Sequence, residues 1–396
     1  MSTKGSWYGW VVVGLLFANI MFGFLGMQSI AVLFPAIAED FTMSMAQMGA
    51  AVGVFNLASP IFTPLGGALA DRYGCRSVLG VSFLILCLAS ALRFYVDSAN
   101  MLIGCMFLYG VGFAPIGAVV PKALSNFFPP QQLGRANGVT FAAFGVGGTL
   151  AFAITATVLL PAMGGWRATM LLFAALSLIA VVAWIAIYRD PAEAIGRTGG
   201  ENMLESFKQV LAIRDIWLLS LTYAFVMLGC WTIIALLPSQ LGSRGLSPQT
   251  AQWMMLTAVV FNVVGGMVSD HLGRRKPVLI ACAVALTIAL PLMVVAQGSL
   301  LIVALILAGM CFGSIIPVAS AVPVEIKAVG PALAGTGVGV MFMIGNTGGF
   351  AGPFISGWLI DSFGTPWAGY GFVTIAAFVA IFIAVKMGET GRAAQS

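Results

Sequence analysis

The sequence predicts an all-α membrane protein with about twelve transmembrane helices in two six-helix bundles, on the evidence of composition, apolar runs and an internal repeat. Of its 396 residues, 60% are hydrophobic and only 8% are charged. Soluble domains carry roughly 25% charged residues, so this chain has too few to cover a water-exposed surface. Composition alone therefore indicates a membrane protein.

A helix needs about 20 apolar residues to cross the hydrocarbon layer, and runs of about that length follow one another along the chain. The run that begins after Trp7 is too long for the core of a cleavable signal peptide, so it is predicted to be the first span. The predicted spans of the first half are 10–34, 47–70, 78–95, 101–120, 138–160 and 168–188. Those of the second half are 216–238, 250–268, 278–297, 300–319, 335–360 and 367–386.

The two halves are predicted to be separate bundles, 1–189 and 215–396, joined by a central cytoplasmic loop, 190–214. The loop is polar and contains Pro191, a glycine pair and charges of both signs. A short surface helix is expected within it, around 201–210.

The basic residues orient this topology in the cell inner membrane. With both termini cytoplasmic, only Arg93, Arg167 and Arg244 of the 18 lysines and arginines fall on the outer side. An excess of basic residues on the cytoplasmic side is the usual orienting signal of membrane proteins. The formal net charge of +5 therefore has a topological cause, and no nucleic-acid partner is expected.

One pattern, G-x-[LV]-x-D-x-x-G-x-R, follows both the second and the eighth predicted spans, 199 residues apart (270 − 71). A second repeated feature is a proline in the fourth and tenth spans, Pro115 and Pro317, which are 202 residues apart (317 − 115). Two repeated features with nearly the same sequence separation indicate that the halves arose by duplication. The motif residues are Gly67, Asp71, Arg72, Gly74 and Arg76 in the first copy, and Gly266, Asp270, Gly273, Arg274 and Arg275 in the second.

The first copy resembles the G-x-L-x-D-R-x-G-x-R loop of the major facilitator superfamily, and the second copy is a weaker form of it. The resemblance covers essentially the whole chain. It implies two bundles that rock about a central substrate site and expose it alternately to each side of the membrane. Because one chain holds both bundles, it is expected to function as a monomer within the lipid bilayer.

A narrower resemblance links the chain to the monocarboxylate transporters and the oxalate–formate antiporter relatives. Residues 5–13 (GSWYGWVVV) resemble the G-x-W-G-W-V-V opening of that group, and 126–129 with 134–138 resemble its W-F-P…R-G-x-A-x-G loop. The sequence departs from the group where its carboxylate carriers place an arginine in the eighth span and a lysine in the eleventh. Asn262 and Asn346 stand there, so the fixed central cation is missing.

The repeated motif is predicted to be a gating latch. Its glycines permit a tight turn, Asp71 can accept hydrogen bonds at a helix end, and the arginines can meet carboxylates or carbonyls of the neighbouring bundle. Such contacts would form in one transport state and break in the other. The alternative is that these charges only anchor the loops at the lipid headgroups.

Uncharged polar and aromatic side chains are the main candidates for substrate binding, because ionisable residues deep in the spans are nearly absent. Amides and hydroxyls could bind a small polar or weakly acidic solute, with Trp231 and Phe342 as an apolar wall. The alternative is adhesion between packed helices. The candidates are Asn19, Gln28, Asn56, Lys122, Tyr223, Trp231, Asn262, Phe342 and Asn346.

Lys122 is the one basic candidate. If the fourth span continues to Ser125, its ammonium lies inside the apolar boundary and could attract an anion. It could instead snorkel to the headgroups, or pair with Glu325 in the corresponding region of the second half.

The favoured function is secondary active transport of a small organic solute, a monocarboxylate or similar weak organic acid, driven by a coupled proton or by solute exchange. Efflux of hydrophobic drugs or metabolites is the alternative, and a non-transporting receptor or scaffold is an alternative of another class. The spans contain no catalytic set, and the six cysteines form no C-x-x-C pair or Cys/His cluster. No enzymatic activity, metal or cofactor is therefore expected.

Overall fold

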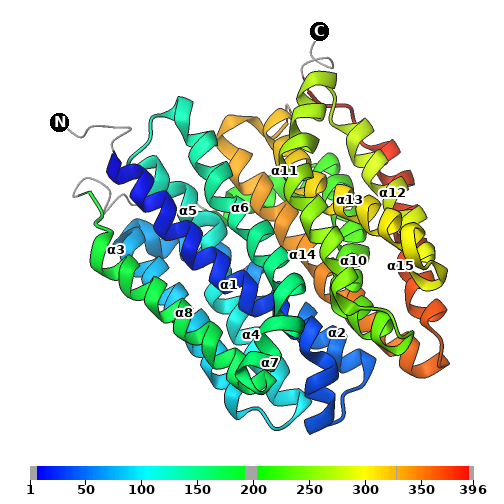
Figure 1. Ribbon diagram of the computed structural model, residues 1–396. Helices are drawn as coiled ribbons and strands as arrows, with labels where there is room; N and C mark the ends of the chain where they lie inside the picture. The colour runs from blue at the N-terminus through cyan, green and yellow to red at the C-terminus, as the bar shows by residue number, and fades with distance from the viewer. Residues whose placement is uncertain (1–6, 192–202, 327, 392–396) are drawn as a thin grey trace. The chain divides into compact units, whose positions relative to one another are not determined.

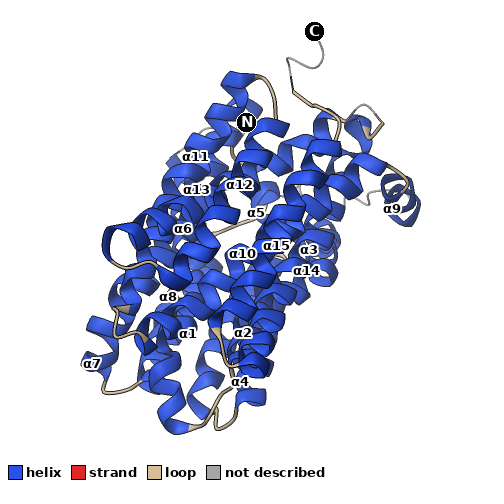
Figure 2. Cartoon of the chain, turned by 90° about the vertical axis from the view of Figure 1, so that its right-hand side faces the viewer, coloured by secondary structure: helices blue, strands red, loops and turns tan. Residues whose placement is uncertain are grey.

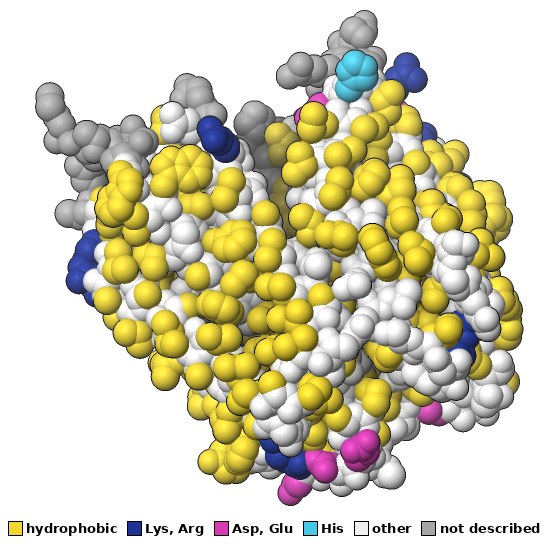
Figure 3. All heavy atoms as spheres, in the orientation of Figure 1, with side chains coloured by type: hydrophobic (Ala, Val, Ile, Leu, Met, Phe, Trp, Pro, Cys, Tyr) yellow, Lys and Arg dark blue, Asp and Glu magenta, His cyan; other side chains and the backbone are white. Residues whose placement is uncertain are grey.

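The computed structural model describes residues 7–191, 203–326 and 328–391, and every regular element within them is helical (Figure 2). Eleven helical stretches of this described part are long and apolar enough to cross a membrane. The prediction of an all-helical membrane protein is therefore confirmed. Figure 3 shows hydrophobic side chains over most of the visible face, with charged ones mainly toward its upper and lower margins.

The chain divides into two compact units. The first contains Met1–Thr42 and Leu57–Gly200, and the second contains Met43–Asn56 and Glu201–Ser396. The second unit therefore includes a short segment that precedes most of the first half.

In the first unit, the long helix α1 packs along α6 and α8 (Figure 1). A Cβ at Gly147 of α6 would lie 2.6 Å from the carbonyl oxygen of Met21, so only glycine allows α6 to approach α1 this closely. After α6 the backbone continues through one π-helical turn, Thr155–Leu159, into the short helix α7. The helices are α1 (Trp7–Asp40), α3 (Phe55–Leu92), α4 (Ala99–Phe113), α5 (Ile116–Ser125), α6 (Pro130–Ile154), α7 (Leu160–Met163) and α8 (Trp166–Ile187).

In the second unit, α10 packs along α14, which corresponds to the packing of α1 along α6 in the first unit. Helix α11 packs along α13. Gly348 faces the carbonyl oxygen of Ala224 so closely that a Cβ there would overlap it. The glycine-rich stretch of α14 thus serves tight packing. The helices are α2 (Met45–Gly53), α9 (Met203–Leu211), α10 (Arg214–Ser243), α11 (Gln252–Leu272), α12 (Lys276–Val295), α13 (Gly298–Glu325), α14 (Gly330–Phe363) and α15 (Pro366–Lys386).

Two predicted spans, 47–70 and 78–95, fall within one helical stretch, Met45–Tyr95. The chain interrupts this stretch at Val54, between α2 and α3, and again at Gly74, whose φ of 83° and ψ of 161° are non-helical. Glycine adopts a positive φ without steric cost, so the chain turns there within one residue. This sharp turn explains why eleven stretches correspond to a larger number of predicted spans.

The predicted surface helix of the central segment is present as α9, Met203–Leu211. Its predicted first residues lie outside the described part of the chain.

Candidate gate and solute-binding residues

The motif acid of the first unit is paired within that unit. Asp71 forms an ion pair with Lys122, and their side chains are 44% and 28% exposed. Helix α5 does continue to Ser125, which places Lys122 in its last turn. The lysine therefore has a carboxylate partner of its own.

Asp190, which follows α8, holds the turn at Gly74. Its carboxylate accepts hydrogen bonds from the backbone N–H groups of Cys75 (3.1 Å) and Arg76 (2.9 Å). The Tyr188 hydroxyl donates to the same carboxylate at 3.1 Å. The second segment of α3 thus begins with an acidic cap, which suits the positive end of a helix dipole.

Arg76 contacts a backbone carbonyl near the end of α8, the kind of group that the motif arginines were expected to meet. Its guanidinium donates to the carbonyl oxygen of Ile185 at 2.5 Å, and its own carbonyl accepts from the Trp184 indole at 3.2 Å. Both partners belong to α8 of the same unit. The neighbouring-bundle partners expected for the motif are therefore not the contacts seen for Asp71 and Arg76.

The second motif copy contains a less exposed ion pair. Arg275 donates to Glu325 at 2.7 Å and to Asp270 at 2.5 Å. The Arg275 and Glu325 side chains are 14% and 19% exposed, whereas Asp270 is 69% exposed. The hydrogen bond to Glu325 is the main reason that the pKa of Arg275 lies above its usual value. Glu325 is thus paired with Arg275, not with Lys122.

The two units use opposite charges at corresponding places. In the first, a motif acid meets a basic residue at the end of α5; in the second, a motif base meets an acidic residue at the end of α13. Each arrangement neutralises charge beside the motif turn. Because the acidic and basic partners are exchanged between the two units, the two ion pairs do not appear as identical residues in the repeat.

Glu389 repeats the role of Asp190 and was missed by sequence reasoning. Its carboxylate accepts from the backbone N–H groups of Arg275 and Lys276, both at 3.1 Å. Asp190 and Glu389 are 199 residues apart (389 − 190), the offset of the motif copies. Applying that offset to acidic residues after the last span of each half would have found both caps.

Of the solute-binding candidates in the first unit, Asn19 holds helices together. Its Nδ2 donates to the carbonyl oxygens of Leu15 (2.9 Å) and Ala180 (3.0 Å), joining α1 to α8. Gln28 differs, because it is 1% exposed and neither Oε1 nor Nε2 has a partner among the described residues. Buried amides normally find partners, so Gln28 is the better candidate for a solute contact.

In the second unit, the aromatic candidates lie on α10 and α14. Tyr223 meets Phe342 edge-to-face with ring centroids 5.6 Å apart, and Trp231 lies 6.0 Å from Phe55. Asn56 donates to the carbonyl oxygen of Gly53 at 3.3 Å. These contacts account for the burial of Tyr223, Trp231 and Asn56 by packing.

Asn262 and Asn346 remain available to a solute. Asn262 is exposed and Asn346 is half-buried. No side-chain hydrogen bond is seen for either amide within the described residues. By the resemblance to the carboxylate carriers, cations were expected at these two positions, and both amides lack a side-chain partner in the described part of the chain.

Arg93, which the predicted topology places at the outer end of the span 78–95, is fully buried. One guanidinium nitrogen donates to the carbonyl oxygen of Gly26 at 2.7 Å, and the group lies 4.5 Å from the centroid of the Tyr109 ring. Nε and Nη2 have no partner among the described residues. The carbonyl and the π face stabilise this cation inside the first unit.

Helix α2 is fixed to α14 within the second unit. The Asp361 carboxylate accepts from the backbone N–H groups of Met45 (3.0 Å) and Ala46 (2.8 Å). Ser44 and Gln47 add a capping box at the same end. The first turn of α2 therefore has both local and tertiary partners.

In a comparison of sequences, the family model described as Major Facilitator Superfamily matches this chain over residues 16–239 and again over residues 219–395. The chain belongs to the Major Facilitator Superfamily. It is accordingly a secondary transporter of small organic solutes and not an enzyme.

Curated relatives of this facilitator include transporters of organic acids. The hexuronate transporter of Bacillus subtilis is 25% identical over 388 residues, covering 89% of this chain and 88% of the relative. Human monocarboxylate transporter 11 is 29% identical over 383 residues, covering 91% of this chain and 78% of the relative. The resemblance to the monocarboxylate group is therefore confirmed at low identity.

A solved structure shows the same fold for this facilitator. It is a crystal structure of a bacterial homolog to the human lysosomal transporter Spinster, in an inward-facing and unoccupied conformation. The TM-score is 0.78 at 18% identity, and 96% of each chain is covered.

Proposed function

We propose that this facilitator carries a small organic acid, a monocarboxylate or a sugar acid, across the cell inner membrane by alternating access. Proton symport or solute exchange supplies the driving force, and both termini are cytoplasmic. The observation that supports an acid is the set of relatives named for hexuronate and monocarboxylate transport.

Unpaired amides, and not a fixed cation, are the proposed contacts for the solute. Lys122 and Arg275 are neutralised by carboxylates, and Arg93 is enclosed by Gly26 and Tyr109. Gln28, Asn262 and Asn346 can donate to a carboxylate or bind hydroxyl groups. Because these amides carry no charge, binding to them favours an acid that travels together with a proton, since that pair carries no net charge.

The test is uptake into proteoliposomes of labelled lactate, pyruvate, acetate, oxalate, benzoate and glucuronate, each with and without an inward proton gradient. Accumulation driven by the gradient supports the proposal. Electrogenic uptake that is independent of pH contradicts proton coupling, and failure of the whole panel in protein that still moves a hydrophobic dye favours the exporter.

Substitution separates solute contacts from packing amides. Asn262→Ala and Asn346→Ala are expected to raise KM for the accepted acid about tenfold, the usual effect of losing one hydrogen bond to a charged group. Asn19→Ala is the matched control, since that amide donates to the carbonyl oxygens of Leu15 and Ala180 and joins α1 to α8. Equal effects at all three positions would remove the assignment of Asn262 and Asn346.

A further inference from the structure

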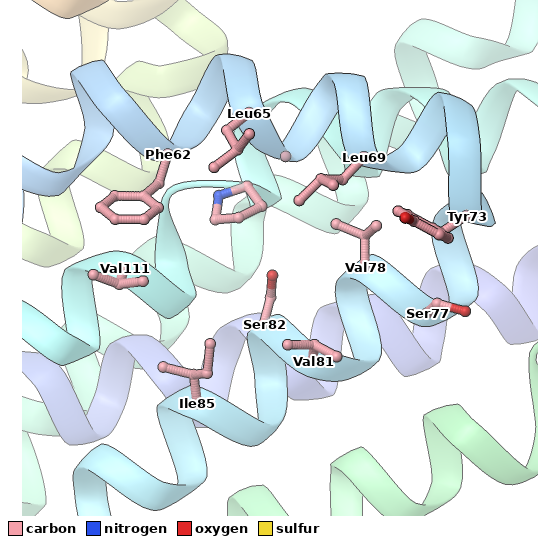
Figure 4. A pocket seen from close by; sticks show the side chains of 12 residues that line it. Phe62, Leu65, Leu69, Tyr73, Ser77, Val78, Val81, Ser82, Ile85 and Val111 are labelled. Atoms are coloured by element: carbon pink, nitrogen blue, oxygen red, sulfur yellow. The ribbon is translucent and has the colours of Figure 1, made fainter. Parts of the chain in front are cut away.

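An apolar groove lies between the two segments of α3 in the first unit. Its volume is about 490 Å³. Figure 4 shows side chains of the two segments facing each other across it, with Tyr73 and Ser77 at one end and Phe62 and Val111 at the other. Apolar side chains dominate the lining, among them Leu65, Leu69, Val78, Val81 and Ile85.

The length of the groove matches the depth of one membrane leaflet. From Phe62 to Tyr73 the helix advances 11 residues (73 − 62), or about 16 Å at the helical rise of 1.5 Å per residue. The hydrocarbon layer is about 30 Å thick, so one leaflet contributes about 15 Å. The groove therefore extends from the level of the motif turn to about the middle of the membrane.

The groove is open along its rim and closed at its floor. Leu65, Tyr73 and Val81 are 47%, 52% and 58% exposed. At the floor, a Cβ on Gly66 would lie 2.5 Å from the Cβ of Pro115, so the backbones approach closely there. An apolar channel that is open along one side is shaped for a hydrocarbon chain.

Positive charge gathers at the Tyr73 end. The Arg72 guanidinium lies 5.2 Å from the centroid of the Tyr73 ring, and Arg76 follows the turn at Gly74. Neither arginine forms an ion pair with a carboxylate in the described part of the chain, whereas nearby Asp71 is neutralised by Lys122. Basic residues at headgroup level attract anionic lipids.

We propose that this groove binds one anionic phospholipid, with an acyl chain between the two segments of α3 and the phosphate at Arg72. The bound lipid then contacts both sides of the motif turn and stabilises the angle between the two segments. The proposal concerns the bilayer and not the transported solute, so it stands or falls independently of the proposed function.

The test is a titration of the purified full chain with phosphatidylglycerol and with phosphatidylcholine of identical acyl chains, read by native mass spectrometry. The expected result is one retained phosphatidylglycerol per chain, with phosphatidylcholine bound at least fivefold more weakly. Arg72→Gln should weaken phosphatidylglycerol binding about fivefold, the usual effect of one basic residue at the membrane surface, and should leave phosphatidylcholine unchanged. Arg135→Gln is the matched control, because that arginine lies beside Trp10 and not at the groove.

Filling the groove tests the acyl-chain site separately. Val81→Trp places a large ring over the channel and should remove the retained lipid, whereas Leu178→Trp, at a 46% exposed position on α8, should not. Equal retention of both lipids by the native chain would overturn the headgroup assignment. Unchanged retention in Val81→Trp would overturn the groove itself.

Discussion

At the residue scale, the role of each charged group depends on which partner the fold gives it. The sequence leaves Lys122 with three roles: an anion site, a snorkelling side chain or a partner of Glu325. The structure gives it Asp71 from the neighbouring segment. Spacing along the chain could not select this partner, because Asp71 and Lys122 lie on different helices and are 51 residues apart in the sequence.

Asp71→Asn is expected to impair transport more than folding. The pair is about one-third exposed, and exposed ion pairs contribute up to about 1 kcal/mol to the free energy of unfolding. Transport should fall at least tenfold if the motif latches one state, while the melting temperature in detergent changes little. Normal uptake at normal expression would exclude the latch.

Glu325→Gln is expected to destabilise the second unit. It leaves the mostly buried Arg275 without its main carboxylate partner, which should cost about 1.5–3 kcal/mol of unfolding free energy. Asp270→Asn is the matched control, because Asp270 is 69% exposed and binds the same arginine. Thermal unfolding of the two variants in one detergent should rank Glu325→Gln well below Asp270→Asn, and the reverse order would contradict the pairing described here.

At the element scale, the long helices and the turn at the motif glycine Gly74 were predictable from the sequence, and the short interruption at Val54 was not. Apolar runs such as 168–188 correspond closely to the helix that forms, α8, because lipid requires every backbone polar group to be satisfied within the helix. The interruption at Val54 is slight, because this residue keeps right-handed helical angles (φ −58°, ψ −27°) and its N–H still bonds to the carbonyl oxygen of Ala50. No apolar-run pattern distinguishes α2 from α3 at this point.

Gly49→Ala should disrupt the packing of α2 on α14. A Cβ at Gly49 would overlap the carbonyl group of Pro353, and overpacking of this kind costs about 1–3 kcal/mol. Gly14→Ala is the matched control, since a Cβ there meets nothing within 4 Å. Because alanine favours helix over glycine by about 1 kcal/mol, the control should unfold at an equal or higher temperature. Equal destabilisation by both variants would show that α2 is not held as described.

At the scale of the whole molecule, duplication is the most informative property of the sequence. It predicts the repeated motif turn, and the same offset relates the caps Asp190 and Glu389. The candidate solute site was less predictable. Asn19 and Asn262 look alike in sequence, but one amide is used between α1 and α8 while the other has no partner in the described residues. Only the tertiary neighbours distinguish them.

The predicted orientation can be tested with two new cysteines. Asp97 lies in a predicted outer loop and His271 in a predicted cytoplasmic one, and both side chains are exposed. With both termini cytoplasmic, a membrane-impermeant maleimide should label Asp97→Cys in intact cells and His271→Cys only after permeabilisation. The native chain is the background control, because its six cysteines are buried.

The labelling pattern tests two properties separately: the orientation of the chain in the membrane, and whether the number of crossings between the two labelled sites is odd or even. The reverse pattern would invert the proposed orientation while keeping the number of crossings between the two sites odd. Labelling of both positions from one side would require an even number of crossings between Asp97 and His271, and so would contradict the duplicated arrangement of spans. The basic residues favour labelling of Asp97→Cys in intact cells and of His271→Cys only after permeabilisation, since most of them lie on the side assigned to the cytoplasm.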